Sequence, residues 1–365
     1  MSQTDYDFAV IGAGIAGASL AAELAPHARV VVLEAEDQPG YHATGRSAAF
    51  WDECYGGPDI VPLTLASGPF LRENGFLTRR GALYIGREQD RGDLDDFLDR
   101  FAQSGATLER LSQSALAEKA PMLRRDWCDA IWEPACSDID VAALHNHYLK
   151  QLSKAGGELR TRAPLVSARL VDDSWRLDCG AEEIRAKVLI NAAGAWVDEV
   201  ARVAGVKPVG ITPLRRTVVQ LRVSPAASPD LPLVLDVGGQ FYFKPENGRL
   251  WLSPHDEEPS VPCDAAPEEI AIAEAIHRLT SVVDFEIELV ERKWAGLRSF
   301  APDRLPIYGR DGAIPEFFWF AGQGGWGIQT APAAARLAAQ ALLEQPADAM
   351  TKGINAQTYS PMRFG

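Results

Sequence analysis

The sequence predicts an α/β fold, and three patterns lead to that prediction. A short buried strand near the N-terminus runs directly into a glycine-rich loop and an alanine-rich helix, and a second strand follows. Two segments far along the chain repeat the order of a strand followed by small residues. Between these units lie strand-like stretches separated by proline and glycine turns. Strands that alternate with helices are typical of a sheet with a parallel core.

Length and composition exclude several classes of protein. With 365 residues, 47% of them apolar and 24% charged, the chain is long enough for one large α/β domain or two domains. The net charge of −14 argues against broad nucleic-acid binding. No apolar run is long enough to cross a membrane and no basic segment precedes an apolar core, so we expect a cytoplasmic protein. Five scattered cysteines without a C-x-x-C pair predict reduced thiols and no metal site.

The N-terminal unit has the pattern of a dinucleotide-binding motif. A strand over 7–11 leads into Gly12-Ala13-Gly14-Ile15-Ala16-Gly17, a helix over 16–25, a strand over 28–33 and Glu34. Gly12 permits the tight turn, Gly14 lets the backbone approach a pyrophosphate, and Gly17 allows close packing of helix and strand. Glu34 is expected to accept both ribose hydroxyls. This motif alone leaves NAD and FAD as alternatives.

Later segments favour a flavin. Residues 40–49 are small apart from one arginine, and such a stretch can run extended beside a long cofactor, although a plain loop is an equal reading. A strand over 317–321 leads into a glycine-rich loop over 322–330 and a helix expected from Pro332 to Leu343. A glycine-rich loop before a helix N-terminus stabilises negative charge, which reduced flavin carries.

These motifs resemble those of the D-amino acid oxidase-like superfamily of FAD enzymes. The matching pieces are Ile11–Gly17 with Glu34, Gly45–Ala49, Asn191–Trp196, Trp294–Arg298, Asp303-x-x-Pro306-x-x-Gly309 and Gly322–Thr330. They follow one another in order along nearly the whole chain. The nearest resemblance is to bacterial FAD-dependent D-arginine and D-amino acid dehydrogenases.

The resemblance implies a Rossmann-like FAD-binding domain (1–75, 140–205 and 295–365) and a substrate domain with a mixed β-sheet (76–139 and 206–294). It implies non-covalent FAD: His42 lies in the small-residue loop, but close relatives keep that histidine without a covalent link. The cofactor contacts that we expect are Gly12, Gly14, Ala16, Gly17, Glu34, Ala35, Thr44, Gly45, Arg46, Ser47, Ala48, Leu165, Ala193, Gly194, Gly324, Gly325, Trp326, Gly327 and Ile328.

Oxidation of an amino acid by flavin requires that the substrate carboxylate is held while hydride passes from Cα to flavin N5. Arginine suits this task because its planar fork binds a carboxylate at two points. The family carries such arginines at Arg216 and Arg298, and Arg215 should then face the other side of its strand. The resemblance also implies that Tyr55, Tyr242 and Gln329 lie at the substrate.

Two positions depart from the D-arginine-specific relatives. Those enzymes carry a histidine and a glutamate that contacts the basic side chain, and here the corresponding residues are Phe50 and Ala82. Asp52 and Glu53 are candidate replacements for the lost anion, but we expect both to face solvent. Neutral or small substrates are therefore expected to be preferred over basic ones.

The sequence thus predicts oxidation of a D-amino acid to an imine, which hydrolyses to a 2-oxo acid and ammonia. An electron acceptor, oxygen or a quinone, must reoxidise the flavin. Oxidation of secondary amines such as sarcosine or iminodiacetate is an alternative. A 2-hydroxy-acid dehydrogenase and a flavin-binding subunit without chemistry of its own also stay open.

Overall fold

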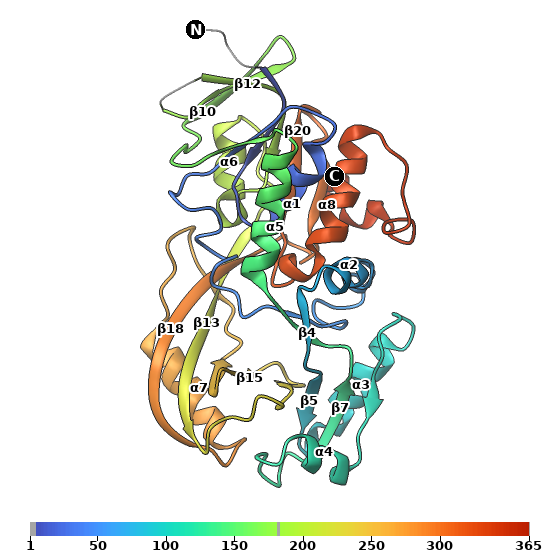
Figure 1. Cartoon of the computed structure of the whole chain (residues 1–365), viewed down its shortest axis with the longest axis vertical. Coiled ribbons are helices and arrows are strands. Elements are labelled where there is room, and N and C mark those ends of the chain that lie inside the picture. Colours follow the sequence, from blue (N-terminus) through green and yellow to red (C-terminus); the bar gives the residue numbers. More distant parts are fainter. Residues whose placement is uncertain (1–4, 181–182, 365) are drawn as a thin grey trace.

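The computed structural model describes residues 5–180 and 183–364, and over that range the chain forms two bodies stacked along its long axis (Figure 1). Within the described residues the strands build an eight-stranded sheet, a nine-stranded sheet and a small sheet of three strands. The eight-stranded sheet occupies the half of the molecule that holds both described ends, and the nine-stranded sheet occupies the other half.

The eight-stranded sheet has a parallel core, as the sequence predicts. Strand β1 pairs in parallel with β2 and β12, β12 pairs in parallel with β20, and β2 pairs in parallel with β9. Strand β11 pairs antiparallel with the first half of β12, and β10 pairs antiparallel with β11. Strand β19 pairs antiparallel with β20. The strands are β1 (Asp5–Ile11), β2 (Val30–Leu33), β9 (Glu158–Arg160), β10 (Ser167–Val171), β11 (Ser174–Asp178), β12 (Glu183–Asn191), β19 (Ile307–Arg310) and β20 (Phe317–Ala321).

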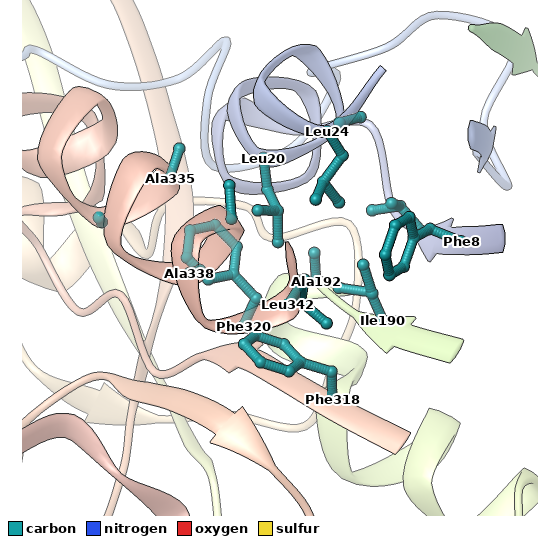
Figure 2. Packing of buried hydrophobic residues seen from close by; sticks show 14 of the residues in the cluster. Phe8, Leu20, Leu24, Ile190, Ala192, Phe318, Phe320, Ala335, Ala338 and Leu342 are labelled. Atoms are coloured by element: carbon teal, nitrogen blue, oxygen red, sulfur yellow. The ribbon is translucent and has the colours of Figure 1, made fainter. Parts of the chain in front are cut away.

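Helices α1 (Ile15–Leu24) and α8 (Gly327–Leu343) cover one face of this sheet. Their small residues let the helices approach closely, and Figure 2 shows Leu20, Leu24 and Ala338 in one cluster with the aromatic side chains of Phe318 and Phe320. Helix α5 (Val141–Lys154) packs against α1, and α6 (Val197–Val203) packs on the opposite face of the sheet. Burial of these apolar surfaces fixes the strand ends at which the cavity described below opens.

The nine-stranded sheet is mixed and includes the longest strand pair in the described chain. Strands β13 (Thr212–Ser224) and β18 (Glu286–Phe300) run antiparallel along their whole length, and α7 (Glu269–Thr280) packs against them. The remaining strands of this sheet are β5 (Ala82–Gly86), β6 (Glu109–Arg110), β7 (Asp129–Glu133), β14 (Leu233–Asp236), β15 (Tyr242–Glu246), β16 (Arg249–Ser253) and β17 (Glu258–Pro259).

A three-stranded sheet joins the two halves. It is formed by β3 (Phe50–Trp51), β8 (Ser137–Ile139) and β4 (Leu77–Arg79). The other helices are α2 (Val61–Glu73), α3 (Arg91–Phe101) and α4 (Gln113–Lys119), with short 3₁₀ turns over Glu88–Asp90, Gly194–Trp196, Ala356–Tyr359 and Pro361–Phe364.

The structure differs from the sequence-based expectation at the start of the last long helix. Helix α8 begins at Gly327 rather than near Pro332, which lies inside the helix. In the described part of the chain, none of the helices combines the length and the apolar character that a membrane span requires.

Candidate active site

One large cavity runs from the N-terminal glycine loop to the long strand pair of the second sheet. Its volume is about 550 Å³, within the range of ligand-binding cavities. The wall is built from the loop after β1, the end of β2, residues 40–50, the loop after β12 and the N-terminus of α8. The facing wall comes from β13, β15 and β18.

Close backbone approach explains the glycines at the first end of the cavity. Gly12 has a φ of +98°, and a Cβ atom there would lie 2.7 Å from the carbonyl oxygen of Ala192. A Cβ at Gly17 would overlap the carbonyl oxygen of Gly12, so α1 packs directly on the turn. The N–H of Ile15 donates to the Thr44 hydroxyl over 2.9 Å, which joins the small-residue loop to the start of α1.

Glu34 lies where a ribose acceptor was expected and is held by the backbone. Its carboxylate accepts the N–H of Ala13 over 2.7 Å and the N–H of Glu36 over 3.0 Å. A carboxylate has about four acceptor sites. Two therefore stay available on a side chain that lines the cavity.

The second glycine loop forms another part of the wall. Gly325 lies so near the arginine end that a Cβ atom there would be 2.5 Å from the Tyr55 hydroxyl and 2.8 Å from Arg298 Nη1. Helix α8 then begins at Gly327 without a side-chain cap. Its first-turn N–H groups are thus directed to the cavity end, where they suit an anion.

Most residues expected to contact the cofactor line this cavity, and three do not. Those that line it are Gly12, Gly14, Ala16, Glu34, Ala35, Thr44, Arg46, Ser47, Ala48, Leu165, Ala193, Gly194, Gly324, Gly325, Gly327 and Ile328. Gly17 and Gly45 lie behind the wall at close backbone contacts. Trp326 lies behind it too, because its ring packs edge-on against Phe300 and Tyr55.

Arg216 and Arg298 lie on the same face of the long strand pair. In the antiparallel register Arg216 is opposite Gly296 and Leu214 is opposite Arg298, so the two arginines are diagonal neighbours. Gly296 has no side chain, which leaves room beside Arg216. Both arginines line the cavity, whereas Arg215 pairs with Glu268 over 2.7 Å on the other side of the strand.

Each of these arginines keeps a guanidinium nitrogen without a partner among the described residues. Arg216 is 7% exposed; its Nε donates to the Asp256 carbonyl over 2.9 Å, but its buried Nη1 has no acceptor. Arg298 donates from Nη1 to the Tyr55 hydroxyl over 3.0 Å, while its buried Nε has no acceptor. Burial and the nearby Arg298 lower the pKa of Arg216 to about 10, so it stays charged at neutral pH.

Two acidic residues and a third arginine, which the sequence reasoning missed, surround the pair. Glu257 accepts from Arg298 Nη2 over 3.2 Å and from Arg304 Nη2 over 2.9 Å, and it lies 3.5 Å from Arg216 Nη2. Burial alone would raise the pKa of Glu257, but the bond to Arg304 and the three positive charges bring it below its ordinary value. Asp256 uses its carboxylate on Thr217. The acidic doublet that begins three residues after the end of β16 was the available signal.

Aromatic side chains complete this end of the cavity. Tyr55 and Tyr242 both line it, and the Phe50 ring packs between them at 5.3 and 5.7 Å between centroids. Burial raises the pKa of Tyr242. Behind Tyr242, burial and the charges of the two arginines lower the pKa of His255 to about 3, so this imidazole is neutral near pH 7.

Gln329 lines the cavity, but its amide is occupied by the protein. Its Nε2 donates to the Thr64 hydroxyl over 2.9 Å and to the Tyr55 carbonyl over 3.2 Å, and its Oε1 accepts the Asp52 N–H over 3.2 Å. The side chain therefore holds the segment that carries Tyr55.

Three expectations about substrate specificity need correction. Asp52 and Glu53 do not face solvent: they are 0% and 7% exposed and make hydrogen bonds inside the protein. Ala82 is fully buried at the start of β5 and does not line the cavity, whereas Phe50 does. The loss of an acid at position 82 is thus not what sets the charge of this cavity.

Comparisons with known proteins show the family and the fold of the chain. The model of the FAD dependent oxidoreductase (DAO) family matches residues 7–341. Over 93% of its length the chain is 24% identical to FAD-dependent oxidoreductase domain-containing protein 1 of Mus musculus, of which it covers 81%. It superposes on glycine oxidase from Geobacillus kaustophilus with a TM-score of 0.85 (22% identity, 98% and 99% of the two chains). Iminodiacetate oxidase from Chelativorans gives a TM-score of 0.80 (24% identity, 97% and 98%).

Proposed function

Because the chain belongs to the FAD dependent oxidoreductase family and uses FAD, we propose that it oxidises the α carbon–nitrogen bond of small, neutral D-amino acids. The product is an imine, which water hydrolyses to a 2-oxo acid and ammonia. One observation carries the proposal: Arg216 is buried and Arg298 is half-buried in the wall of the cavity, and each has a guanidinium nitrogen without a partner among the described residues.

The residues at the other end of the cavity fit FAD. Gly12 and Gly14 line the cavity at the start of α1, where backbone suits a pyrophosphate, and Glu34 keeps acceptor sites for ribose hydroxyls. The α8 N-terminus suits the negative charge that a reduced flavin carries. When bound, FAD supplies the two-electron acceptor for the hydride that leaves the substrate Cα.

The charges around the arginine pair favour a substrate with one carboxylate. Arg216, Arg298 and Arg304 carry three positive charges, and Asp256 and Glu257 carry two negative charges, so one positive charge is left. A single substrate carboxylate neutralises it and provides acceptors for the two unpartnered nitrogens. A second carboxylate would be desolvated without a cation, which is costly.

The wall beside the arginines supports a neutral substrate side chain. Phe50 and Val218 line it, and Glu257 is already bound to arginines. Among the described residues, the carboxylates that line the cavity come from Glu34, Glu36 and α6, all on the side of the eight-stranded sheet. A guanidinium or ammonium entering beside Phe50 would lose water without gaining a partner.

N-substituted glycines are the second candidate class. The similarity to proteins named glycine oxidase and iminodiacetate oxidase supports it. The charge count favours sarcosine over iminodiacetate, because iminodiacetate brings a second carboxylate.

The experiment that tests the proposal is anaerobic bleaching of the flavin. The purified FAD protein is mixed with D- and L-amino acids, sarcosine, iminodiacetate and 2-hydroxy acids, and the absorbance of oxidised flavin is followed. Bleaching by neutral D-amino acids is expected to be fastest, and readmission of oxygen or addition of a quinone then identifies the electron acceptor. If only 2-hydroxy acids bleach the flavin, or if none of these compounds does, the proposal is refuted.

A further inference from the structure

A buried pair of carboxyl groups lies behind Tyr55. Asp52 follows β3 and Glu133 ends β7, so the pair joins the three-stranded sheet to the nine-stranded sheet. Both residues are 0% exposed, and neither lines the cavity. Two ionised carboxylates in such a place would each be desolvated and would repel one another. The protein must therefore neutralise one of them.

Within the described part of the chain, no cation around the pair performs this task. The ionisable groups nearest to the pair are Glu53, Cys54, Tyr84 and Cys136. Three cations interact with these neighbouring groups by Coulomb attraction and not by hydrogen bonds: Arg72 with Glu53, Arg100 with Cys54 and Lys244 with Cys136. Among the described residues, no lysine or arginine is hydrogen-bonded to Asp52 or Glu133.

The hydrogen bonds identify which carboxyl is ionised. The Asp52 carboxylate accepts the N–H of Cys54 over 2.8 Å, the N–H of Tyr55 over 2.9 Å and the Tyr84 hydroxyl over 2.7 Å. Glu133 accepts only the N–H of Glu53, over 2.8 Å, and its buried Oε2 has no donor among the described residues. Asp52 and Glu133 each place a carboxyl oxygen within 4.8 Å of the other's, and two carboxyl groups this close can share a hydrogen bond only through a proton.

We propose that Glu133 is protonated and donates its hydroxyl to Asp52, and that this pair is a positioning device for Tyr55 and, through it, for Arg298. The proposal goes beyond the proposed function but rests on it where substrate binding is concerned. Burial, as the largest cause, raises the pKa of both carboxyl groups, in agreement with one retained proton.

The path from the pair to the cavity is short. Asp52 holds the backbone N–H of Tyr55, and Gln329 holds the Tyr55 carbonyl. The Tyr55 hydroxyl then accepts from Arg298 Nη1 over 3.0 Å. Loss of the Asp52 acceptor would free the segment and let the hydroxyl leave the arginine. The substrate carboxylate would then bind to a guanidinium that is no longer oriented.

The test compares three variants of the FAD-loaded protein. Glu133→Gln keeps an N–H donor toward Asp52 and an acceptor for Glu53, so KM at neutral pH is expected within about twofold of the unmodified protein. Asp52→Asn leaves one acceptor oxygen instead of two, so either Cys54 and Tyr55 or Tyr84 and Glu133 face an NH₂ group, and KM is expected to rise roughly tenfold or more while kcat changes less. Glu53→Gln is the matched neighbouring control and is expected to leave KM unchanged.

Two further measurements keep the proposal falsifiable. Tyr84→Phe removes one hydrogen-bond donor to Asp52 without changing charge. We expect it to raise KM by less than Asp52→Asn does, and it can be measured if Asp52→Asn does not fold. Infrared spectroscopy in H₂O and D₂O should show a protonated carboxyl band at neutral pH that Glu133→Gln abolishes. This band tests the proton irrespective of activity, so its failure is distinct from that of the proposed function.

Three results would overturn the proposal. The first is the absence of a protonated carboxyl band that depends on Glu133. The second is an unchanged KM in both Asp52→Asn and Tyr84→Phe. The third is a stoichiometric metal ion in the purified protein that Glu133→Gln removes. Asp52, Cys54 and Glu133 each place an atom that can bind a metal within 4.8 Å of the others, and such a result would assign the cluster to a cation instead.

Discussion

Arg216→Met tests the carboxylate site most directly. The substitution keeps an apolar stem of similar reach and removes a guanidinium that is 7% exposed and carries an unpartnered Nη1. Loss of a charge-assisted contact to a desolvated carboxylate costs about 2–5 kcal/mol. Because Arg298 stays in place, we expect the lower part of that range. About 2–3 kcal/mol corresponds to a roughly 30- to 150-fold weaker affinity for the substrate carboxylate.

The assay follows the flavin spectrum while a non-reacting carboxylate such as benzoate is added. It measures binding without turnover, and the FAD content of each variant is determined first. Arg215→Met is the matched control, because Arg215 precedes Arg216 on β13 but pairs with Glu268 away from the cavity. We expect its affinity for benzoate to stay within about twofold of the unmodified protein, because Arg215 does not line the cavity. If Arg216→Met binds benzoate as tightly as Arg215→Met does, the assignment of Arg216 is wrong.

Three further outcomes are expected. Denaturation should release FAD from the yellow protein; a chromophore that stays on the chain would instead point to His42 or Cys263, which both line the cavity. D-Arginine should have a kcat/KM at least roughly tenfold below that of neutral D-amino acids, because its guanidinium finds no free carboxylate; a clear preference for D-arginine contradicts this. His255→Asn, which suits the φ of 57° there, should flatten the pH dependence of the melting temperature below pH 6.5. The folded protein keeps the pKa of His255 at about 3, whereas the unfolded chain binds a proton near pH 6.5, so stability falls as the pH drops between these values. An equal slope in both proteins would exclude this role.

Local patterns in the sequence were sufficient to predict the cofactor half of the fold. The strand, glycine loop, helix and second strand from Asp5 to Leu33 are as predicted, because each of their signals lies within a few residues of its effect. The opposite directions of Arg215 and Arg216 were predictable for the same reason, since side chains alternate along a strand.

The start of α8 and the surroundings of Asp52 depended on tertiary contacts. The residues Gly324–Gly327 look like a loop in the sequence, but α8 begins at Gly327 because packing on α1 and α2 stabilises a turn that helix propensity alone disfavours. Asp52 and Glu53 are polar and were expected at the surface. They are buried because Tyr84, Thr107 and Glu133, all distant in sequence, supply their partners.

The sequence by itself determined the class of fold and the glycine loops, and its resemblance to a known family led to the prediction that Arg216 and Arg298 bind a carboxylate. Only the tertiary structure decided how the charges balance around them. Glu257 becomes a counter-ion because β13, β18 and the turn with Arg304 bring three guanidinium groups to its carboxylate. Electrostatic energy depends on distances in space and on burial, and neither is encoded within the few neighbouring residues that a sequence pattern samples.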